Sequence, residues 1–317
     1  MMLQEGKNDN AASSCYRCQA KMAKKYAFRL TGRDNAILEA IDRFPLTADQ
    51  LCRISVTFEH PFSDVHSVRR RLRKLAAAGL VQARPYAVAS YGSSPAYYKL
   101  TRDGYRMQYG HDAELPKRRY FDPIGQARHP HTRKLADFLV HVFSVAHDAG
   151  YRIQHFAREN SVVLETASGE LRPDAAFQVI AGNRALNFLV ELDNGTERVQ
   201  SKRDTESIER KIRGYYSHSR AMKAFDRDRY VVLFVTTRSA VRLKHMMAHA
   251  SAIMSNSQRT LFLGTTLDDF LTRKDALSAK CFLSPDFKST AMIPQSSRGT
   301  DRTKVEPNLI STFPAFC

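Results

Sequence analysis

The stretch of sequence that most constrains the fold is a pair of apolar runs joined by a short turn. Residues 172–197 read RPDAAFQVIAGNRALNFLVELDNGTE, and Gly182-Asn183 lies between the two runs. Glycine and asparagine between two strand-like runs are typical of a tight β-hairpin. If the turn has two residues, Ala181 faces Arg184, and this pair sets every other facing pair along the two strands. The sequence therefore predicts the hairpin together with its register.

This register brings carboxylates together at one end of the hairpin. It places Asp174 opposite Glu191 and Arg172 opposite Asp193, with all four side chains on one face. Like charges that face each other destabilise a sheet, so Asp174 and Glu191 need a cation or a shared proton. Mg²⁺, or the similar Mn²⁺, prefers oxygen ligands, which makes Asp174 and Glu191 candidate metal ligands. The alternative is a hydrogen-bonded strand end, in which Asp193 only begins a turn.

The segments around this hairpin predict an α/β domain. Strand-like runs cover residues 161–166, 174–181, 185–192, 229–237 and 260–264, and helical patterns cover 131–151, 197–219 and a segment from about Ser239. Strands that alternate with helices favour a mixed central sheet with helices on both faces. The predicted fold class of this part of the chain is mixed α/β.

The first hundred residues have a different organisation. A helical pattern runs from Arg33 to Phe44, a second follows Thr47, and a third follows Ser63 and stops at Gly79. Two strand-like runs separated by a Gly/Ser turn come next. Three helices followed by a hairpin is the order of a winged helix-turn-helix domain, whose third helix enters the major groove of DNA.

The third helix of this segment is strongly basic. It carries Arg69, Arg70, Arg71, Arg73 and Lys74. The chain as a whole has a formal net charge of +17, which favours a polyanionic partner. We therefore predict that these five side chains contact double-stranded DNA, although a charged helix face that is merely solvated would have the same composition.

Short motifs in the second half are similar to those of a known family. The segments RPDA at 172–175 and FLVELDNGTE at 188–197, in this order of elements, resemble the PD-(D/E)xK nuclease fold. Residues 128–216 most resemble the replication-relaxation family of plasmid and mobile-element proteins. The resemblance implies a winged helix coupled to a nuclease-like domain, with a role in plasmid replication, DNA relaxation or transfer. Replication or conjugative-transfer proteins are the partners that it implies.

The resemblance also implies roles for individual residues. Asp174 and Glu191 would be metal ligands of a Mg²⁺-dependent DNA endonuclease, and Glu159 matches an acidic position before the first strand. The third motif position is Asp193 where a catalytic lysine is expected.

A cation from elsewhere could replace the missing lysine. Helical geometry places Lys211 at the edge of the buried face of the following helix, so Lys211 is the first candidate catalytic cation. Arg172 is the second, although a structural salt bridge with Asp193 is the simpler interpretation. Two functions stay open: a Mg²⁺-dependent nuclease, or a non-catalytic winged-helix regulator or recruitment factor with a degenerate nuclease-like domain.

The remaining composition suggests where the domains lie. The expected division is a flexible N-terminal segment 1–30, a winged helix 31–109, a linker 110–130, a nuclease-like domain 131–283 and a mobile tail 284–317. We expect no signal peptide and no membrane association, because no apolar run has the length of a membrane span. The five cysteines are scattered and odd in number, which favours a reducing compartment and a cytoplasmic location.

Overall fold

The computed structural model describes residues 29–87, 94–166, 169–195, 207–223 and 226–294. The chain forms two compact units, which divide between Ala136 and Asp137. The predicted flexible N-terminal segment lies outside the described residues except for Arg29 and Leu30. Within the described ranges, no helix has the length and apolar character needed to cross a membrane.

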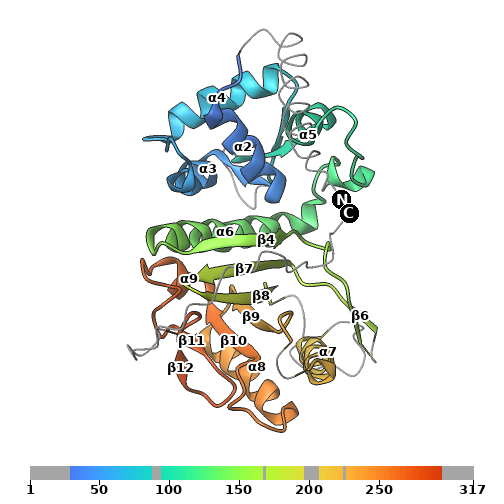
Figure 1. Cartoon of the computed structure of the whole chain (residues 1–317), viewed down its shortest axis with the longest axis vertical. Coiled ribbons are helices and arrows are strands. Elements are labelled where there is room, and N and C mark those ends of the chain that lie inside the picture. Colours follow the sequence, from blue (N-terminus) through green and yellow to red (C-terminus); the bar gives the residue numbers. More distant parts are fainter. Residues whose placement is uncertain (1–28, 88–93, 167–168, 196–206, 224–225, 295–317) are drawn as a thin grey trace, which may run out of the picture. The chain divides into compact units, whose positions relative to one another are not determined.

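The first unit combines helices with a small antiparallel sheet (Figure 1). Its helices include α2 (Gly32–Arg43), α3 (Ala48–Ile54), α4 (Val65–Ala77) and α5 (Arg102–Tyr109), with 3₁₀ turns at Ser55–Thr57, Arg118–Tyr120 and Gln126–Arg128. The strands β1 (Leu46–Thr47), β2 (Val81–Pro85) and β3 (Ala96–Leu100) pair in the order β1-β3-β2.

Side-chain caps explain where these helices begin. Thr31 and Thr47 each form a capping box with the residue three positions later, and the Asp64 carboxylate accepts from the Ser67 N–H at 2.8 Å. Such caps satisfy N–H groups that have no partner inside a helix. The cap at Thr47 is the one that the sequence predicts, and α4 begins directly after the predicted position.

The order of these elements is the one predicted for a winged helix, and that assignment stays a prediction. Most of the predicted turn between the two strands falls in residues 88–93, which lie outside the described residues. The structure adds α5, whose Gly104 lies against the backbone of Leu80. A Cβ atom at Gly104 would lie 2.0 Å from the Leu80 carbonyl oxygen, so this close approach requires glycine.

The structure corrects the linker predicted over residues 110–130. The Tyr120 hydroxyl donates to the Asp42 carboxylate at 2.6 Å, and the Lys99 ammonium donates to the Asp122 carbonyl at 2.6 Å. This segment therefore packs on the first unit. Its prolines, glycines and lack of periodicity suggested a linker, but they say nothing about tertiary hydrogen bonds.

The second unit is built on one large sheet. Its helices are α6 (His129–Asp148), whose first residues belong to the first unit, α7 (Ile208–Ala221), α8 (Ala240–Ile253) and α9 (Leu267–Leu271). Its strands are β4 (Arg152–Ala157), β5 (Leu164–Thr166), β6 (Gly169–Leu171), β7 (Ala175–Ala181), β8 (Arg184–Asp193), β9 (Tyr230–Thr236), β10 (Phe262–Thr266), β11 (Phe282–Leu283) and β12 (Ser289–Thr290).

The sheet confirms the predicted mixed α/β fold. Seven strands lie in the order β12-β11-β10-β9-β8-β7-β4 (Figure 1). β8, β9 and β10 are parallel, and the other neighbours are antiparallel. The hairpin of β7 and β8 has the predicted register, from Ala181 facing Arg184 to Ala175 facing Val190. Because β8 is central, it is buried without interruption from Asn187 to Asp193.

Helices cover both faces of this sheet, as predicted. Residues of α7 and α8, such as Tyr215 and Met247, form one core cluster with Ala157 of β4. The neighbouring Phe156 contacts Phe143 of α6, with ring centroids 5.9 Å apart. Since successive residues of a strand point to opposite faces, α6 covers the face opposite to α7 and α8.

One further prediction on this unit needs correction, and one strand lies outside the large sheet. The run predicted over 161–166 contains the strand Leu164–Thr166, which among the described residues pairs with Gly169–Leu171 in a separate hairpin. The predicted mobile tail does not begin at 284, because Met292 and Ile293 are buried. Residues 295–317 lie outside the described residues, as do residues 197–206 of the predicted helix over 197–219.

Candidate functional site

Glu191 is the centre of a buried polar cluster in the second unit. It lies on β8 with 3% of its surface exposed. The Tyr215 hydroxyl donates to one carboxylate oxygen at 2.5 Å, and the Lys211 ammonium donates to the other at 3.0 Å. Both donors come from α7, where positions four apart lie on the same face. The structure therefore brings Lys211 to Glu191, as the sequence predicts.

The surroundings of Glu191 shift its protonation. Burial raises the pKa of Glu191 to about 7; the Lys211 ammonium opposes this shift and the Asp174 carboxylate adds to it. Burial, together with the charge of Glu191, also raises the pKa of Tyr215 well above its ordinary value. Tyr215 therefore keeps its proton and remains a hydrogen-bond donor at neutral pH.

Asp174 lies next to Glu191 but does not continue the ladder of the hairpin. Its N–H donates to the Val190 carbonyl at 2.9 Å, and its carboxylate accepts from the Leu192 N–H at 2.7 Å. Asp174 thus bonds to the residues on either side of Glu191. The sequence predicted that Asp174 faces Glu191 directly, but the hydrogen bonds of Asp174 go to Val190 and Leu192 instead. The two carboxylates still lie close enough to affect each other electrostatically.

Glu159 joins this group from the segment between β4 and β5. A carboxylate oxygen of Glu159 and one of Asp174 lie within 4.8 Å of each other. The sequence predicted Glu159 only as an accessory position, on the resemblance to a family. Asp174, Glu191 and Glu159 offer oxygen atoms only, which is the donor set that Mg²⁺ and Mn²⁺ prefer.

The predicted salt bridge between Arg172 and Asp193 is wrong. Arg172 bonds to Glu170 at 2.6 Å, whereas both oxygens of Asp193 accept from Arg242 of α8, at 2.6 and 2.7 Å. The Thr236 hydroxyl also donates to Asp193, at 2.7 Å. The pairing of β7 with β8 ends at Ala175, so Arg172 does not face Asp193. Asp193 instead pairs with Arg242 of α8, which is far away in the sequence.

The Asp193 carboxylate stays ionised in this setting. Burial works against its charged form, but hydrogen bonds from Arg242, Thr236 and the Gly195 N–H lower the pKa of Asp193. Asp193 therefore connects the end of β8 to β9 and to α8. Arg172, which bonds to Glu170, does not supply the missing catalytic cation beside Glu191.

The basic residues of α4 divide into exposed and paired side chains. Arg69, Arg70, Arg73 and Lys74 are exposed. Arg71 instead forms two hydrogen bonds to the carboxylate of Asp34, which is fully buried. The charge of Arg71 thus holds α4 against the start of α2, and the predicted contact of Arg71 with DNA stays a prediction.

Tyr215, together with Lys211, belongs to the features that resemble the replication-relaxation family, but the sequence did not predict its hydrogen bond to Glu191. A tyrosine on the apolar stripe of a helix reads as a packing residue, and it is indeed fully buried. The signal that could have found it is its spacing of four from Lys211, which predicts that both side chains project from the same part of α7.

Comparisons with known proteins add a family to this geometry. A family model described as replication-relaxation matches residues 41–232. A comparison with curated proteins found no match.

The solved structures that are similar to the chain include two of the restriction endonuclease FokI. The free enzyme has 12% identity and a TM-score of 0.27, covering 78% of this chain and 45% of that chain. The DNA-bound enzyme has 12% identity and a TM-score of 0.26, covering 77% and 44%. The chain therefore spans less than half the length of the FokI chains.

Proposed function

Because the chain belongs to the replication-relaxation family, we propose that it is a DNA-binding protein of plasmid or mobile-element replication or DNA relaxation. In this proposal the first unit binds double-stranded DNA, and the second unit holds a divalent metal ion. The observation that carries the proposal is the convergence of Asp174, Glu191 and Lys211 at the end of the β7–β8 hairpin.

The residues present fit a Mg²⁺ or Mn²⁺ ion. Carboxylate oxygens of Glu159 and Asp174 lie within 4.8 Å of each other, and the charge of Asp174 acts on the buried Glu191. Neighbouring carboxylates in a buried setting favour a cation, and each carboxylate oxygen has lone pairs for more than one partner. Asp174 and Glu191 would be the main ligands, with Glu159 as an additional one.

Each protein group near the metal would have a defined task. When bound, the ion supplies Lewis-acid stabilisation of phosphate oxygens and lowers the pKa of bound water. Tyr215 and Lys211 fix the orientation of Glu191 through their hydrogen bonds. The Lys211 ammonium would also offset negative charge that develops on a phosphodiester, which gives it the role of the lysine absent at position 193.

In the first unit, Arg69, Arg70, Arg73 and Lys74 would contact the DNA. These side chains are exposed, and none of the four forms an ion pair with another described residue. Contacts of arginine and lysine with phosphates supply most of the affinity for DNA and make it dependent on salt.

The proposal is tested with Asp174→Asn, which removes a charge and keeps a carbonyl oxygen for the Leu192 N–H. Mg²⁺ binding is measured by calorimetry, and nicking of supercoiled plasmid is measured in parallel. We expect Asp174→Asn to lose both properties and to keep its affinity for DNA. The exposed Glu165 of β5, which has none of the described hydrogen bonds of the cluster, provides the control variant Glu165→Gln, which should behave as the wild type.

The second candidate function is a regulator or recruitment factor without cleavage. The observation that favours it is Asp193, which stands where a catalytic lysine is expected and is bound by Arg242. Metal binding without nicking in the wild type would support this second function. The absence of metal binding in the wild type would contradict the metal site itself.

A further inference from the structure

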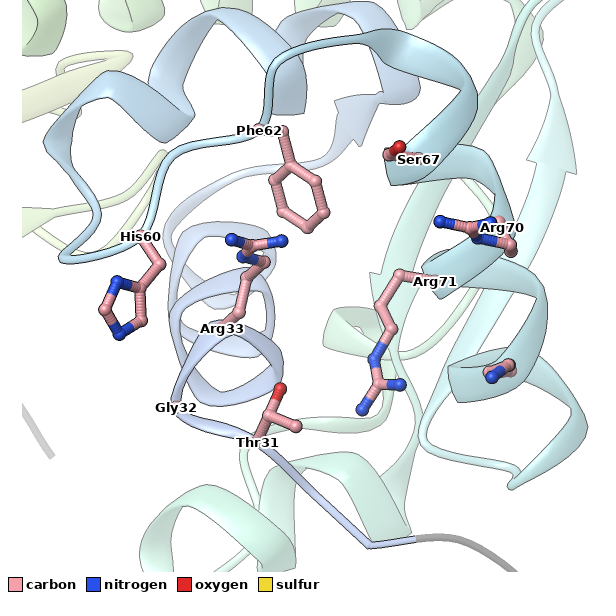
Figure 2. Close-up of a pocket in the computed structure, with 9 residues that line it drawn as sticks. Thr31, Gly32, Arg33, His60, Phe62, Ser67, Arg70 and Arg71 are labelled. Atoms are coloured by element: carbon pink, nitrogen blue, oxygen red, sulfur yellow. The ribbon is translucent and has the colours of Figure 1, made fainter.

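A basic pocket in the first unit has no role in the proposed metal chemistry. It lies between the start of α2 and the helix α4 and has a volume of about 410 Å³. Figure 2 shows the side chain of Arg71 directed from α4 toward Thr31, and the side chain of Arg33 directed toward Phe62. The pocket is also lined by Phe62, Arg70 and Lys74.

The charge of this pocket is unbalanced. Arg71 is neutralised by Asp34, but none of the described residues forms an ion pair with Arg33, Arg70 or Lys74. The residues that line the pocket in the described part of the chain include no carboxylate. Positive side chains gathered in a concave site favour an anionic ligand.

The start of α2 adds backbone donors at the edge of the pocket. Among the described residues, the N–H groups of Gly32 and Arg33 have no hydrogen-bond partner. A Cβ atom at Gly32 would meet no other atom within 4 Å, so the backbone there is open to a ligand. The N-terminus of a helix attracts phosphate groups through such N–H groups and through its dipole.

One wall of the pocket suits a planar group. The guanidinium of Arg33 lies 4.7 Å from the centroid of the Phe62 ring. Figure 2 shows this guanidinium below the ring, toward the interior of the pocket. Phe62 thus holds the Arg33 guanidinium in place, and planar guanidinium groups in turn stack on nucleobases.

We propose that this pocket binds a nucleoside monophosphate unit, either as a free nucleotide or as the 5′-phosphorylated end of a DNA strand. Arg70, Lys74 and the start of α2 hold the phosphate, and Arg33 stacks on the base. The volume lies within the range of about 300–1,000 Å³ typical of small-ligand pockets, which leaves room for more than a phosphate. The inference rests on the proposed function only in that both place nucleic acid on the first unit.

The helix α4 offers a matched control. Arg70 and Lys74 are four residues apart and line the pocket, whereas Arg69 and Arg73 do not. Arg69 and Arg73 instead act electrostatically on Tyr98 of β3, where they oppose the effect of burial on its pKa. Arg70→Gln and Arg73→Gln therefore remove the same charge from the same helix, but only Arg70→Gln alters the pocket.

The test measures binding of a 5′-phosphorylated thymidine trinucleotide to the full chain by calorimetry at constant salt. The unphosphorylated trinucleotide, thymidine monophosphate and inorganic phosphate are compared with it. We expect the wild type to prefer the phosphorylated strand, and Arg33→Gln and Arg70→Gln to weaken its binding about fivefold or more. Arg73→Gln removes a proposed contact with duplex DNA but no pocket residue, so it should weaken binding of the trinucleotide less than Arg70→Gln does.

The outcomes separate this inference from the proposed function. Equal binding of the monophosphate and the trinucleotide supports the pocket with a free nucleotide as the source, and tighter binding of the trinucleotide supports it with a strand end. Equal losses in Arg70→Gln and Arg73→Gln, or inorganic phosphate binding as tightly as the nucleotides, would overturn it. Mg²⁺ binding, measured on the same variants, reports on the second unit alone.

Discussion

Glu191 illustrates at the scale of a single residue how burial and charge act together. A carboxylate on the central strand of a sheet is costly to bury unless it is paired and hydrogen-bonded. Its partners Tyr215 and Lys211 meet this requirement in part, and the pKa raised to about 7 shows the remaining cost. Shifted pKa values of buried ionisable groups are common at functional sites.

The first prediction concerns the pH dependence of stability. A carboxyl group whose pKa is higher in the folded chain binds its proton more tightly there, so protonated Glu191 stabilises the fold. This contribution is complete below the ordinary pKa of 4.5 and is lost as the pH rises through about 7. We expect the metal-free protein to lose up to about 3 kcal/mol of unfolding free energy over this range through Glu191.

The measurement is urea denaturation in chelator at a series of pH values. Other groups titrate in the same range, so the comparison with Glu191→Gln isolates the effect of Glu191. The variant should have a flatter dependence on pH than the wild type. Identical profiles for the two proteins would show that Glu191 has the same pKa in the folded and unfolded chains.

At the scale of elements, the helix α4 combines two functions that its sequence does not separate. Its apolar side holds Val68, Leu72 and Leu75 in the core. Arg71 reaches Asp34 at the start of α2, and the exposed basic residues lie elsewhere on the helix. One arginine of the basic run therefore maintains the unit, and its neighbours are available to a ligand.

The second prediction compares Arg71→Gln with Arg73→Gln. Arg71→Gln leaves the buried carboxylate of Asp34 without its cation, which should lower the unfolding free energy by about 3 kcal/mol. Arg73→Gln removes an exposed charge and should change stability by less than about 0.5 kcal/mol. Chemical denaturation of both variants makes the comparison, and equal stabilities of the two variants would contradict a structural role for Arg71.

At the scale of the whole molecule, the chain has two units with different chemistry. The first concentrates exposed arginine and lysine on α4, and the second holds the buried carboxylate of Glu191 close to the carboxylate of Asp174. The net charge of +17 belongs to the complete chain, so it supports DNA binding in general without assigning it to one unit. Substitutions are required to separate the contributions of the two units.

The third prediction is that DNA affinity and metal affinity change independently. The double variant Arg69→Gln, Arg73→Gln should lower the slope of log affinity against log salt by roughly 2, one for each phosphate contact that is lost. Its Mg²⁺ affinity should equal that of the wild type. Fluorescence anisotropy with duplex DNA at several salt concentrations gives the slope, and an unchanged slope would argue against DNA contact by these two residues.

Local chemistry determined much of what the sequence by itself established. The turn at Gly182-Asn183 set the hairpin register, because a two-residue loop admits only one pairing of the flanking strands. Thr47 began a helix because its hydroxyl caps N–H groups nearby in the chain. The hairpin register also predicted that Asp174 and Glu191 lie near each other. Helical periodicity placed Lys211 at the edge of the buried face of its helix.

Only the tertiary structure decided which charges meet. Arg242 forms an ion pair with Asp193, Arg71 forms one with Asp34, and the Tyr215 hydroxyl donates to Glu191. The partners in these pairs lie between 24 and 49 residues apart. Periodicity indicates which face of an element is buried, but it carries no information on which other element covers that face. The packing of α7, α8 and α4 supplies that information, because a long charged side chain pairs with whichever opposite charge the fold brings within reach.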